Sequence, residues 1–553
     1  MDLGRSIASV PARLGALRGV AGSGLLRPTR PDRVLGAAVA VARWGLTAAA
    51  GSAAGAARFP NRPAVVDELG SLSFAELDRH STAIANAMAE RGIGEGDGLA
   101  IMCRNSRWFV EAAVAASKLG ANAVLVNTGF GGPQLADVLG HEGARGVVYD
   151  EEFAPLVEAR APERVRFVGW HDGPAAVPSL RELATGGSPA ALRPPRRPGR
   201  VVILTSGTTG TPRGATRGTP RGLDSVLALF GRVPLRIGEP ALVAAPLFHA
   251  WGLANLTIAQ AMGSPVVLQR RFDPEATLAA VARHGVTTVA VVPVMLQRIL
   301  ALGPEVAGRY DTSSLRVVAS SGAGLPGDLA LRWMDAFGDN LYNLYGSTEV
   351  AWATIATPAD LRAAPGTAGR PPLGAEVRVC DDAGRPLPAG ATGRIFVGSD
   401  LRFEGYTGGG GKETIDGLLS TGDMGYFDEA ARLFVDGRED DMVVSGGENV
   451  FPAEVEGLLA GDPAVADVAV VGVEDSEFGQ RLKAFVVRRA GATVSEAALK
   501  ARVRSRSARY KVPREVVFVD ELPRNATGKV DRRRLRDAPS SSSRDRAQKR
   551  PDP

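Results

Sequence analysis

The stretch from Leu204 to Ala215 reads LTSGTTGTPRGA and follows a strand-like apolar run that begins at Val201. Its glycines allow the backbone to approach a ligand closely. Five hydroxyl-bearing residues and Arg213 supply hydrogen-bond donors and a fixed positive charge, a combination that suits a polyphosphate. The spacing is not that of a Walker A loop, which needs four residues between its glycines and then Gly-Lys-Ser/Thr. Taken alone, the stretch is more typical of a flexible loop, so distant segments must decide its role.

Length and composition exclude several classes of protein. A chain of 553 residues is too long for one hydrophobic core, so two or more domains are expected. Its 65 basic and 60 acidic residues are nearly balanced, which argues against a nucleic-acid partner. Cys103 and Cys380 are its only cysteines, and both lie in apolar, strand-like runs. This excludes a disulfide framework and a Cys-rich metal site, and it favours a reducing compartment, the cytoplasm.

The N-terminal segment is basic and rich in alanine. Its first thirty residues hold five arginines and one acidic residue. A targeting peptide, a basic amphipathic surface segment and a disordered leader all fit this pattern, and the disordered leader is the favoured interpretation. Residues 34–57 are interrupted by Arg43 and several glycines, so they lack the roughly twenty strongly apolar residues of a membrane span. No transmembrane helix is predicted, and loose peripheral membrane association of residues 1–57 stays open.

From about Phe59 onward the pattern alternates between strands and helices. Ser73 and Glu76 form a capping box that predicts the start of a helix ending before Gly92. Buried strands are expected at 99–103, 123–127, 146–149, 242–245, 265–268, 288–292 and 316–319, with helices at 108–119 and 134–141. This alternation predicts a mostly parallel sheet with helices on both faces.

The pattern changes after Pro371. Shorter alternating strands at 376–380, 393–397 and 425–427 predict a small β-rich subdomain. A further compact unit follows, with helices at 453–459 and 495–506 and strands at 465–473, 482–488 and 516–519. From Ala538 the chain is rich in Ser, Arg and Pro, which is typical of a disordered tail.

Five further segments carry polar or flexible residues, and several of them follow predicted strands. They are PLFHAWG (Pro246 to Gly252), SSGAGLP (Ser320 to Pro326), YGSTE (Tyr345 to Glu349), STGD (Ser420 to Asp423) and NATGK (Asn525 to Lys529). In open parallel α/β sheets, ligands bind beyond the carboxyl ends of the strands. We therefore expect several of these segments to meet at one site.

Together these segments make the chain resemble the adenylate-forming superfamily, which holds acyl-CoA synthetases, adenylation domains and luciferases. LTSGTTGTPRGA, YGSTE, STGD, GRxDD and NATGK stand in the family's order and at its spacing, over roughly residues 58 to 537. SGGENVFPAEVE, from Ser445 to Glu456, resembles the acyl-CoA synthetase or fatty-acid–CoA ligase branch. The joint occurrence is highly specific, whereas each motif alone would be weak.

The implied fold is α/β. The resemblance and the pattern divide the chain into a basic, Ala-rich extension (1–57), a large AMP-binding domain (58–439), a small mobile C-terminal α+β domain (440–537) and a disordered tail (538–553). The large domain would hold parallel-rich sheets with helices and the small β-rich subdomain.

The implied reaction is ATP-dependent acyl-CoA synthesis. A carboxylate would attack the α-phosphate of ATP and release pyrophosphate, and the thiol of CoA would then displace AMP from the acyl-adenylate. Both nucleophiles come from substrates, so catalysis would rest on positioning and charge neutralisation. A medium- or long-chain fatty acid is favoured by the SGGENVFPAEVE segment, the basic leader and small residues near the implied acyl site. Those residues are Gly252, Ala254 and Ala351, whereas Trp251 and Trp352 suit an aryl acid equally well.

The resemblance also implies the nucleotide site. The β- and γ-phosphates would be held by Thr205, Ser206, Gly207, Thr208, Thr209, Gly210 and Arg213, where Arg213 replaces the family's usual lysine. The adenosine would contact Gly322, Ala323, Gly324, Tyr345, Gly346, Ser347 and Thr348, with Tyr345 stacked on adenine. Asp423 would accept hydrogen bonds from the ribose hydroxyls with support from Arg438. Mg²⁺ would be bound by Glu349 and the Thr205 hydroxyl.

The implied catalytic residues are Lys529, His249, Glu349 and Arg438. Lys529 is the strongest candidate, because the chain retains only seven lysines against 58 arginines. Its ammonium would neutralise charge that develops between the carboxylate and the α-phosphate, while His249 would orient the acid. Asp440 matches the family's hinge. Rotation about it would exchange Lys529 for a CoA-binding face around Gly446, Gly447 and Glu448.

Two other functions stay open. A CoA-independent adenylating enzyme would load a carrier protein or close a β-lactone. A catalytically silent sensor would bind an acyl-adenylate or a nucleotide. The presence of Lys529, Glu349 and Asp423 counts against the sensor, because a silent protein has no need of them.

Overall fold

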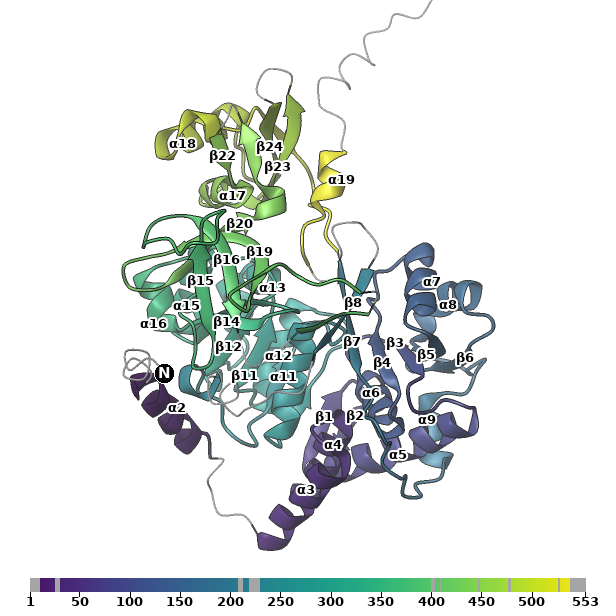
Figure 1. Ribbon diagram of the computed structural model, residues 1–553. Coiled ribbons are helices and arrows are strands. Elements are labelled where there is room, and N and C mark those ends of the chain that lie inside the picture. Colours follow the sequence, from purple (N-terminus) through teal and green to yellow (C-terminus); the bar gives the residue numbers. More distant parts are fainter. Residues whose placement is uncertain are drawn as a thin grey trace, which may run out of the picture.

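Four β-sheets, here called sheets A to D, organise the chain (Figure 1). The structure is a computed structural model, and it describes residues 10–24, 30–206, 212–217, 229–398, 403–407, 409–445, 448–475, 479–525 and 528–537. Sheets A and B form the large N-terminal part, sheet C a small β-rich part, and sheet D the C-terminal part. The predicted α/β class and its three-part architecture are therefore confirmed.

Sheet A has eight strands and is parallel over its six inner strands. Its spatial order is β14 (Ala351–Ala356), β13 (Leu341–Ser347), β12 (Val317–Ser320), β11 (Thr288–Val291), β9 (Ala241–Val243), β10 (Val266–Val267), β1 (Pro63–Asp67) and β2 (Gly70–Ser73). Its connecting helices are α11 (Ala250–Ala261), α12 (Pro274–His284), α13 (Pro293–Leu300), α14 (Gly303–Ala307), α15 (Gly327–Phe337) and α16 (Pro358–Ala363). The carboxyl ends of β9, β11, β12 and β13 consequently lie side by side.

Sheet B has seven strands, of which five are parallel. Its order is β17 (Phe403–Tyr406), β8 (Pro212–Arg217), β7 (Val201–Ser206), β4 (Asn122–Leu125), β3 (Gly98–Met102), β5 (Ala144–Tyr149) and β6 (Val165–Val168). Its helices are α5 (Phe74–Glu90), α6 (Arg107–Leu119), α7 (Gly132–His141), α8 (Ala154–Arg160) and α9 (Leu180–Gly186), with a 3-10 turn, η1 (Glu151–Phe153). Helix α5 begins with the predicted capping box of Ser73 and Glu76.

The largest hydrophobic core lies between sheets A and B. It joins Val65 of β1 and Ile101 of β3 to the fully buried rings of Phe74 and Phe109, which come from α5 and α6. A second core covers the other face of sheet A with α12, α13 and α15, and a third covers sheet B with α7 and α8. Burial of apolar surface on both faces explains why the strands read as continuous apolar runs.

Sheets C and D are smaller and mainly antiparallel. Sheet C contains β15 (Glu376–Cys380), β16 (Gly393–Gly398), β19 (Leu418–Phe427), β18 (Thr414–Ile415) and β20 (Leu433–Arg438). Sheet D contains β22 (Glu448–Val450), β21 (Val443–Ser445), β24 (Gly479–Arg488), β23 (Val465–Asp475) and β25 (Glu515–Phe518). Sheet D carries α17 (Pro452–Ala460), α18 (Glu496–Arg506), α19 (Arg532–Arg536) and η3 (Arg509–Lys511), and η2 (Glu439–Asp441) connects it to sheet C. The domain boundary at 439/440 falls in this connection and stays a prediction.

The sequence pattern does not predict two of the strands, β8 and β14. Strand β7 continues to Ser206, and β8 begins at Pro212 and pairs antiparallel with it, so both described ends of the opening stretch belong to strands. Strand β14 follows the YGSTE segment and also lacks a clear sequence signal. Both strands are specified by their partners: β8 pairs with β7 and β17, and β14 pairs with β13. Such tertiary pairing overrides a weak local preference.

The described part of the N-terminal extension is helical, and its first helix, within the first thirty residues, corrects the interpretation of that stretch as a disordered leader. It forms α2 (Val10–Ser23), α3 (Pro31–Trp44) and α4 (Ala48–Arg58). Helix α4 packs on α5, α6 and α11, and it buries Ala49, Ala50, Ser52 and Gly55. Within the described ranges, every helix falls short of the length and apolarity that a membrane crossing demands. The predicted disordered tail lies outside the described residues.

Two glycines of α4 provide a test of this packing. A Cβ on Gly55 would lie 2.3 Å from Cδ1 of the buried Phe74 ring, whereas nothing lies within 4 Å of a Cβ on Gly51. Gly55→Ala should lower stability by about 1–3 kcal/mol through overpacking. Gly51→Ala should raise it by up to about 1 kcal/mol through helix propensity. The midpoints of thermal unfolding measure both, and equal midpoints would show that α4 is not seated on Phe74.

Candidate active site

Four neighbouring parallel strands deliver polar segments to one edge of sheet A. Strand β9 leads to His249, β11 to Val292, β12 to Gly322 and β13 to Tyr345. Because the strands are parallel and adjacent, their following residues meet at the same edge. The expected convergence of PLFHAWG, SSGAGLP and YGSTE therefore occurs.

Asp423 lies at the junction of sheets A and C. The Tyr345 hydroxyl donates a 2.6 Å hydrogen bond to Asp423 Oδ2. Arg438 pairs with Asp423 across β19 and β20, and its Nη1 donates to Asp423 Oδ1 (3.3 Å) and to the Thr421 carbonyl (3.1 Å). Burial and the Asp423 charge hold the pKa of Tyr345 well above its usual range. The Tyr345 ring is thus fixed, with its hydroxyl kept as a donor.

Glu349 lies at the junction of sheets A and B. The carboxylate is buried, and its two oxygens accept hydrogen bonds from the Ser347 hydroxyl (2.8 Å) and the Tyr406 hydroxyl (2.9 Å). Tyr406 belongs to β17, which pairs with β8 of the hairpin that bears the LTSGTTGTPRGA stretch. The hairpin of sheet B is thereby held beside the carboxylate of sheet A.

The backbone near Glu349 adopts two restricted conformations, at Gly346 and Ala351. A Cβ on Gly346 would lie 1.7 Å from the Ala351 carbonyl oxygen, so only glycine fits there. Ala351 itself has a φ of 59°, a region that residues with a Cβ rarely adopt. Gly322 has a φ of 87°, and Ala323 and Gly324 beside it are exposed. A flat ligand therefore has open backbone beside Tyr345.

His249 lies at the start of α11 with a buried ring nitrogen. Among the described residues its Nε2 has no hydrogen-bond partner, and its ring packs on Phe248 at 4.5 Å between centroids. Burial, with a smaller contribution from the charge of Lys529, lowers the pKa of His249 to about 4. A neutral imidazole with an unsatisfied nitrogen is suited to hold a polar group of a ligand.

The loop bearing Lys529 reaches from the C-terminal domain into this edge of sheet A. Asn525 closes the loop, because its side-chain Oδ1 accepts from the Lys529 backbone N–H at 3.0 Å. A Cβ on Gly528 would lie 2.7 Å from Cγ1 of Val294, so the loop rests directly on the start of α13. Gln297 of the same helix also donates to the Ala466 carbonyl of sheet D. The two domains are therefore docked with Lys529 inside the site.

The charge of Lys529 interacts with the groups already described. The residue is accessible to solvent, yet protein atoms surround its ammonium, and this desolvation lowers its pKa. The negative charge of Asp423 raises the pKa of Lys529, the positive charge of Arg438 lowers it further, and the negative charge of Glu349 raises it. Lys529, Asp423, Glu349 and His249 thus form one electrostatic group drawn from sheet A, sheet C and the C-terminal loop.

Several predicted residues cannot be placed as contacts. Gly207, Thr208, Thr209, Gly210, Gly446 and Gly447 lie outside the described residues. Thr205 and Ser206 end β7, and Thr205 pairs in register with Arg213 of β8. Glu448 begins β22. Their assignment to phosphate, metal or CoA stays a prediction.

Comparisons with known proteins agree with this geometry. The AMP-binding enzyme family matches residues 53–407, and the AMP-binding enzyme C-terminal domain matches residues 454–529. The chain belongs to this family. The predicted adenylate-forming superfamily and the predicted enzyme class, an AMP-forming ligase, are thereby confirmed.

Individual relatives cover nearly the whole enzyme. It is 36% identical to a 2-succinylbenzoate–CoA ligase of Geobacillus kaustophilus, over 86% of this chain and 95% of the relative. It is 33% identical to the fatty acid–[acyl-carrier-protein] ligase ScoC of Streptomyces coeruleorubidus, over 86% and 93%. The solved structure of the anthranilate CoA ligase AuaEII with anthranoyl-AMP has a TM-score of 0.80 and 26% identity, covering 90% of this chain and 98% of that one.

Three contributors to this AMP-binding enzyme's site escaped sequence analysis. Tyr406 lies on β17, whose pairing partner β8 was itself predicted as loop. Val294 and Gln297 belong to an apolar helix, where nothing local signals a contact with the C-terminal domain. For Tyr406, the only available signal was its place in the segment FEGY, and reading that signal required knowledge of the neighbouring strand.

The small size of Gly252 does not open space for an acyl chain. Gly252 was expected to leave room for an acyl chain, but a Cβ there would lie 2.2 Å from the Pro246 carbonyl oxygen. Its small size serves the packing of α11 on the preceding turn. Trp251 is fixed by a 2.9 Å hydrogen bond from its Nε1 to the Val291 carbonyl, so its indole lies beside the end of β11.

His249 provides a pH-dependent test of the site. An unfolded chain protonates this imidazole near its ordinary pKa of 6.5, whereas the folded enzyme does so near 4. The stability that the folded chain gains from keeping this imidazole neutral is therefore fully present above pH 6.5. It is lost as the pH falls through 4, and the free energy of unfolding decreases by up to about 3 kcal/mol. A proton NMR titration of the five histidines should show one that titrates near pH 4.

Lys529→Ala should raise that pKa, because it removes a nearby positive charge. Lys549→Ala serves as the charge-matched control, because it also removes one positive charge and Lys549 belongs to the C-terminal tail of the sequence. A His249 that titrates near 6.5 in the unmodified enzyme would contradict the burial seen here.

Proposed function

We propose that this enzyme is an ATP-dependent acid–CoA ligase. The observation that carries the proposal is the docking of Lys529 beside Asp423, Glu349 and the uncharged His249. A cation, two carboxylates and a neutral imidazole at the edge of a parallel sheet suit a reaction between a nucleotide and a carboxylic acid. The CoA-ligase names of two of the similar proteins support CoA as the acceptor.

The first step forms an acyl-adenylate. One oxygen of the acid bonds to the α-phosphorus of ATP, and the bond from that phosphorus to the pyrophosphate oxygen breaks. We assign Lys529 to the negative charge that accumulates between acid and phosphate, and His249 Nε2 to the acid itself. Tyr345 would stack on adenine, and Asp423 would accept from the ribose hydroxyls in the frame set by Arg438.

Mg²⁺ fits the residues present. Each oxygen of Glu349 accepts one hydrogen bond in the structure, and a carboxylate oxygen can bind a second partner. Glu349, with Thr205 and the phosphate oxygens, would hold the ion, which supplies charge neutralisation when bound. The hairpin tip from 205 to 214 would surround the β- and γ-phosphates.

The second step transfers the acyl group to CoA. The thiol sulfur bonds to the acyl carbon, the bond from that carbon to the phosphate oxygen breaks, and AMP leaves. We propose that the C-terminal domain turns about Asp440 between the two steps. Asp440 lies in η2 between sheets C and D, held only by a 3.7 Å ion pair with Arg438 among the contacts described. The turn would bring the face around Gly446, Gly447 and Glu448 to the site.

Two classes of acid remain candidates. A medium- or long-chain fatty acid is supported by the similarity to the fatty acid–[acyl-carrier-protein] ligase ScoC. An aryl acid is supported by the names of relatives that act on 2-succinylbenzoate or anthranilate, and by Trp251 at the end of β11. We also place the enzyme in a reducing compartment such as the cytoplasm, because both cysteines are free and buried.

Mass analysis of products tests the proposal. The enzyme is incubated with ATP, Mg²⁺, CoA and a panel of fatty and aryl acids, and we expect acyl-CoA, AMP and pyrophosphate. Acyl-adenylate without thioester would favour the carrier-protein or β-lactone alternative, which the similarity to a carrier-protein ligase keeps open. Nucleotide binding with no product would favour the sensor and refute the ligase.

Separate assays of the two half-reactions test the roles of Lys529 and Asp440. Lys529→Ala should reduce adenylation by about 100-fold or more, since it removes a charge that stabilises the transition state. Conversion of supplied acyl-adenylate to acyl-CoA should change little. Asp440→Pro should do the reverse, because proline restricts the backbone at the hinge. Equal losses in both half-reactions would exclude the domain alternation.

A glycine pair supplies the matched control. Gly528 and Gly491 both have a positive φ, of 80° and 74°, but only Gly528 contacts the large domain. Gly528→Ala should slow adenylation roughly tenfold beyond Gly491→Ala, since both variants share the same backbone strain. Similar rates for the two variants would show that docking of the loop on Val294 does not matter.

A further inference from the structure

Exposed large apolar side chains are concentrated in the N-terminal helices. Nine such side chains are exposed among the described residues, and six of them precede residue 47. Leu35 is 66% exposed, Val39 is 56% exposed and Leu46 is 67% exposed. Exposed apolar groups that cluster in this way, rather than singly, mark a surface that contacts something.

The exposed face of α3 is wholly apolar. At 100° per residue, its outward side chains fall within an arc of about 160°. They are Val34, Leu35, Ala38, Val39, Val41 and Ala42, and all six are exposed. We call these six residues, with Leu46 just beyond the helix, the α3 face. The charged Asp32 and Arg43 lie at the edge of the arc or outside it.

The opposite face of α3 accounts for its packing. Ala40 is buried, and a Cβ on Gly36 would lie 3.0 Å from Cβ of Ala57 in α4. Helix α4 in turn packs on α5 and α6 of the large domain. Helix α3 is therefore held on the body through α4, at the lower edge of the view in Figure 1. No described segment covers the α3 face.

The net positive charge of the chain is concentrated in the same region. Residues 1–58 contain eight arginines and two aspartates, whereas residues 59–553 contain 57 basic and 58 acidic residues. The excess positive charge of the protein thus belongs entirely to this extension. Such a segregation attracts an anionic surface and repels a second copy of the same segment.

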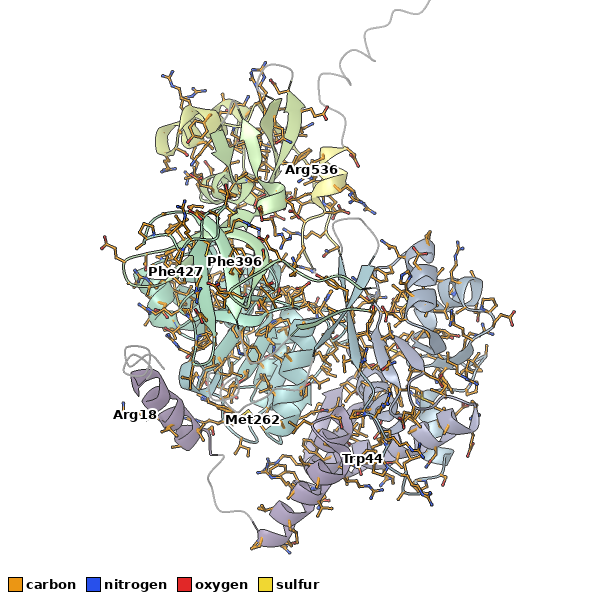
Figure 2. The ribbon with its side chains drawn as sticks, viewed as in Figure 1. Arg18, Trp44, Met262, Phe396, Phe427 and Arg536 are labelled. Carbon is orange, nitrogen blue, oxygen red and sulfur yellow. The ribbon has the colours of Figure 1, made fainter. Side chains whose placement is uncertain are left out.

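Arginines surround the α3 face. Arg30 directly precedes the helix and is exposed. Arg43 lies in the last turn of the helix, just outside the apolar arc. Nη2 of Arg43 donates a 2.5 Å hydrogen bond to the Leu192 carbonyl, which brings the Arg-rich segment 193–200 close to this end. Figure 2 labels Trp44 at the end of α3 and Arg18 on α2. An apolar strip flanked by arginines matches the lipid interface, where acyl chains meet anionic headgroups.

We propose that the α3 face docks this enzyme on an anionic phospholipid surface. The helix lies flat on the surface, with its leucines and valines among the upper acyl chains and its arginines at the headgroups. Its 14 residues span about 21 Å, which suits a helix in the plane of the surface. The proposal is independent of the acid or acceptor that the enzyme uses.

Sedimentation with vesicles tests the proposal. The full chain is mixed with phosphatidylcholine vesicles that contain or lack phosphatidylglycerol. We expect binding to the anionic vesicles, weakened by added salt because exposed charges are screened. Leu35→Ser combined with Val39→Ser should reduce the partition coefficient roughly tenfold or more, since it removes apolar area without a change in charge.

Leu69→Ser is the matched control, because Leu69 is also exposed but lies in the turn after β1. It should leave vesicle binding unchanged, and all these variants should keep the adenylation rate on a water-soluble acid. Absence of vesicle binding would overturn the proposal, as would equal loss in the Leu69 variant. Light scattering that shows a dimer, lost on Leu35→Ser and Val39→Ser, would instead assign the face to a second copy.

Discussion

The hydrogen bond from the Tyr345 hydroxyl to Asp423 joins two sheets that share no strand. Tyr345 lies near the carboxyl end of β13 in sheet A, and Asp423 lies within an antiparallel strand of sheet C. Arg438 holds the other oxygen of the same carboxylate. The relative position of the two sheets is therefore set at the point where a nucleotide would need both an aromatic face and a ribose acceptor.

A second carboxylate does the same for sheets A and B. Glu349 accepts from Tyr406, whose strand pairs with the hairpin of sheet B that is proposed to bind phosphate. Both carboxylates interact electrostatically with Lys529. This residue belongs to the C-terminal domain, and the contact of Gly528 with Val294 holds its loop at the site. A charge carried by a separate domain can be withdrawn, and this is the physical basis of the domain alternation that we propose.

The local sequence pattern predicts helices and strands correctly where their apolar faces are buried. The capping box at Ser73 and the runs that form β3, β11 and β12 are examples, because burial on both faces leaves a continuous apolar signal. Strand β8 gave no such signal, since proline, glycine and arginine are poor strand formers and only its partners specify it. The helical fold of residues 30–58 was missed because small residues in α4 are explained only by the rings they meet, such as Phe74 under Gly55.

The order and spacing of its motifs are enough to assign the chain to the adenylate-forming superfamily and to name Lys529, Glu349 and Asp423. YGSTE carries that information because it lies at the carboxyl end of a strand in a parallel-rich sheet, where ligands bind, whereas STGD lies within an antiparallel strand. Folding alone decided that Tyr406 supports Glu349 and that His249 is held uncharged. It also decided that α3 presents an apolar face outward. These features depend on neighbours far apart in sequence, and no local pattern encodes burial by a distant segment.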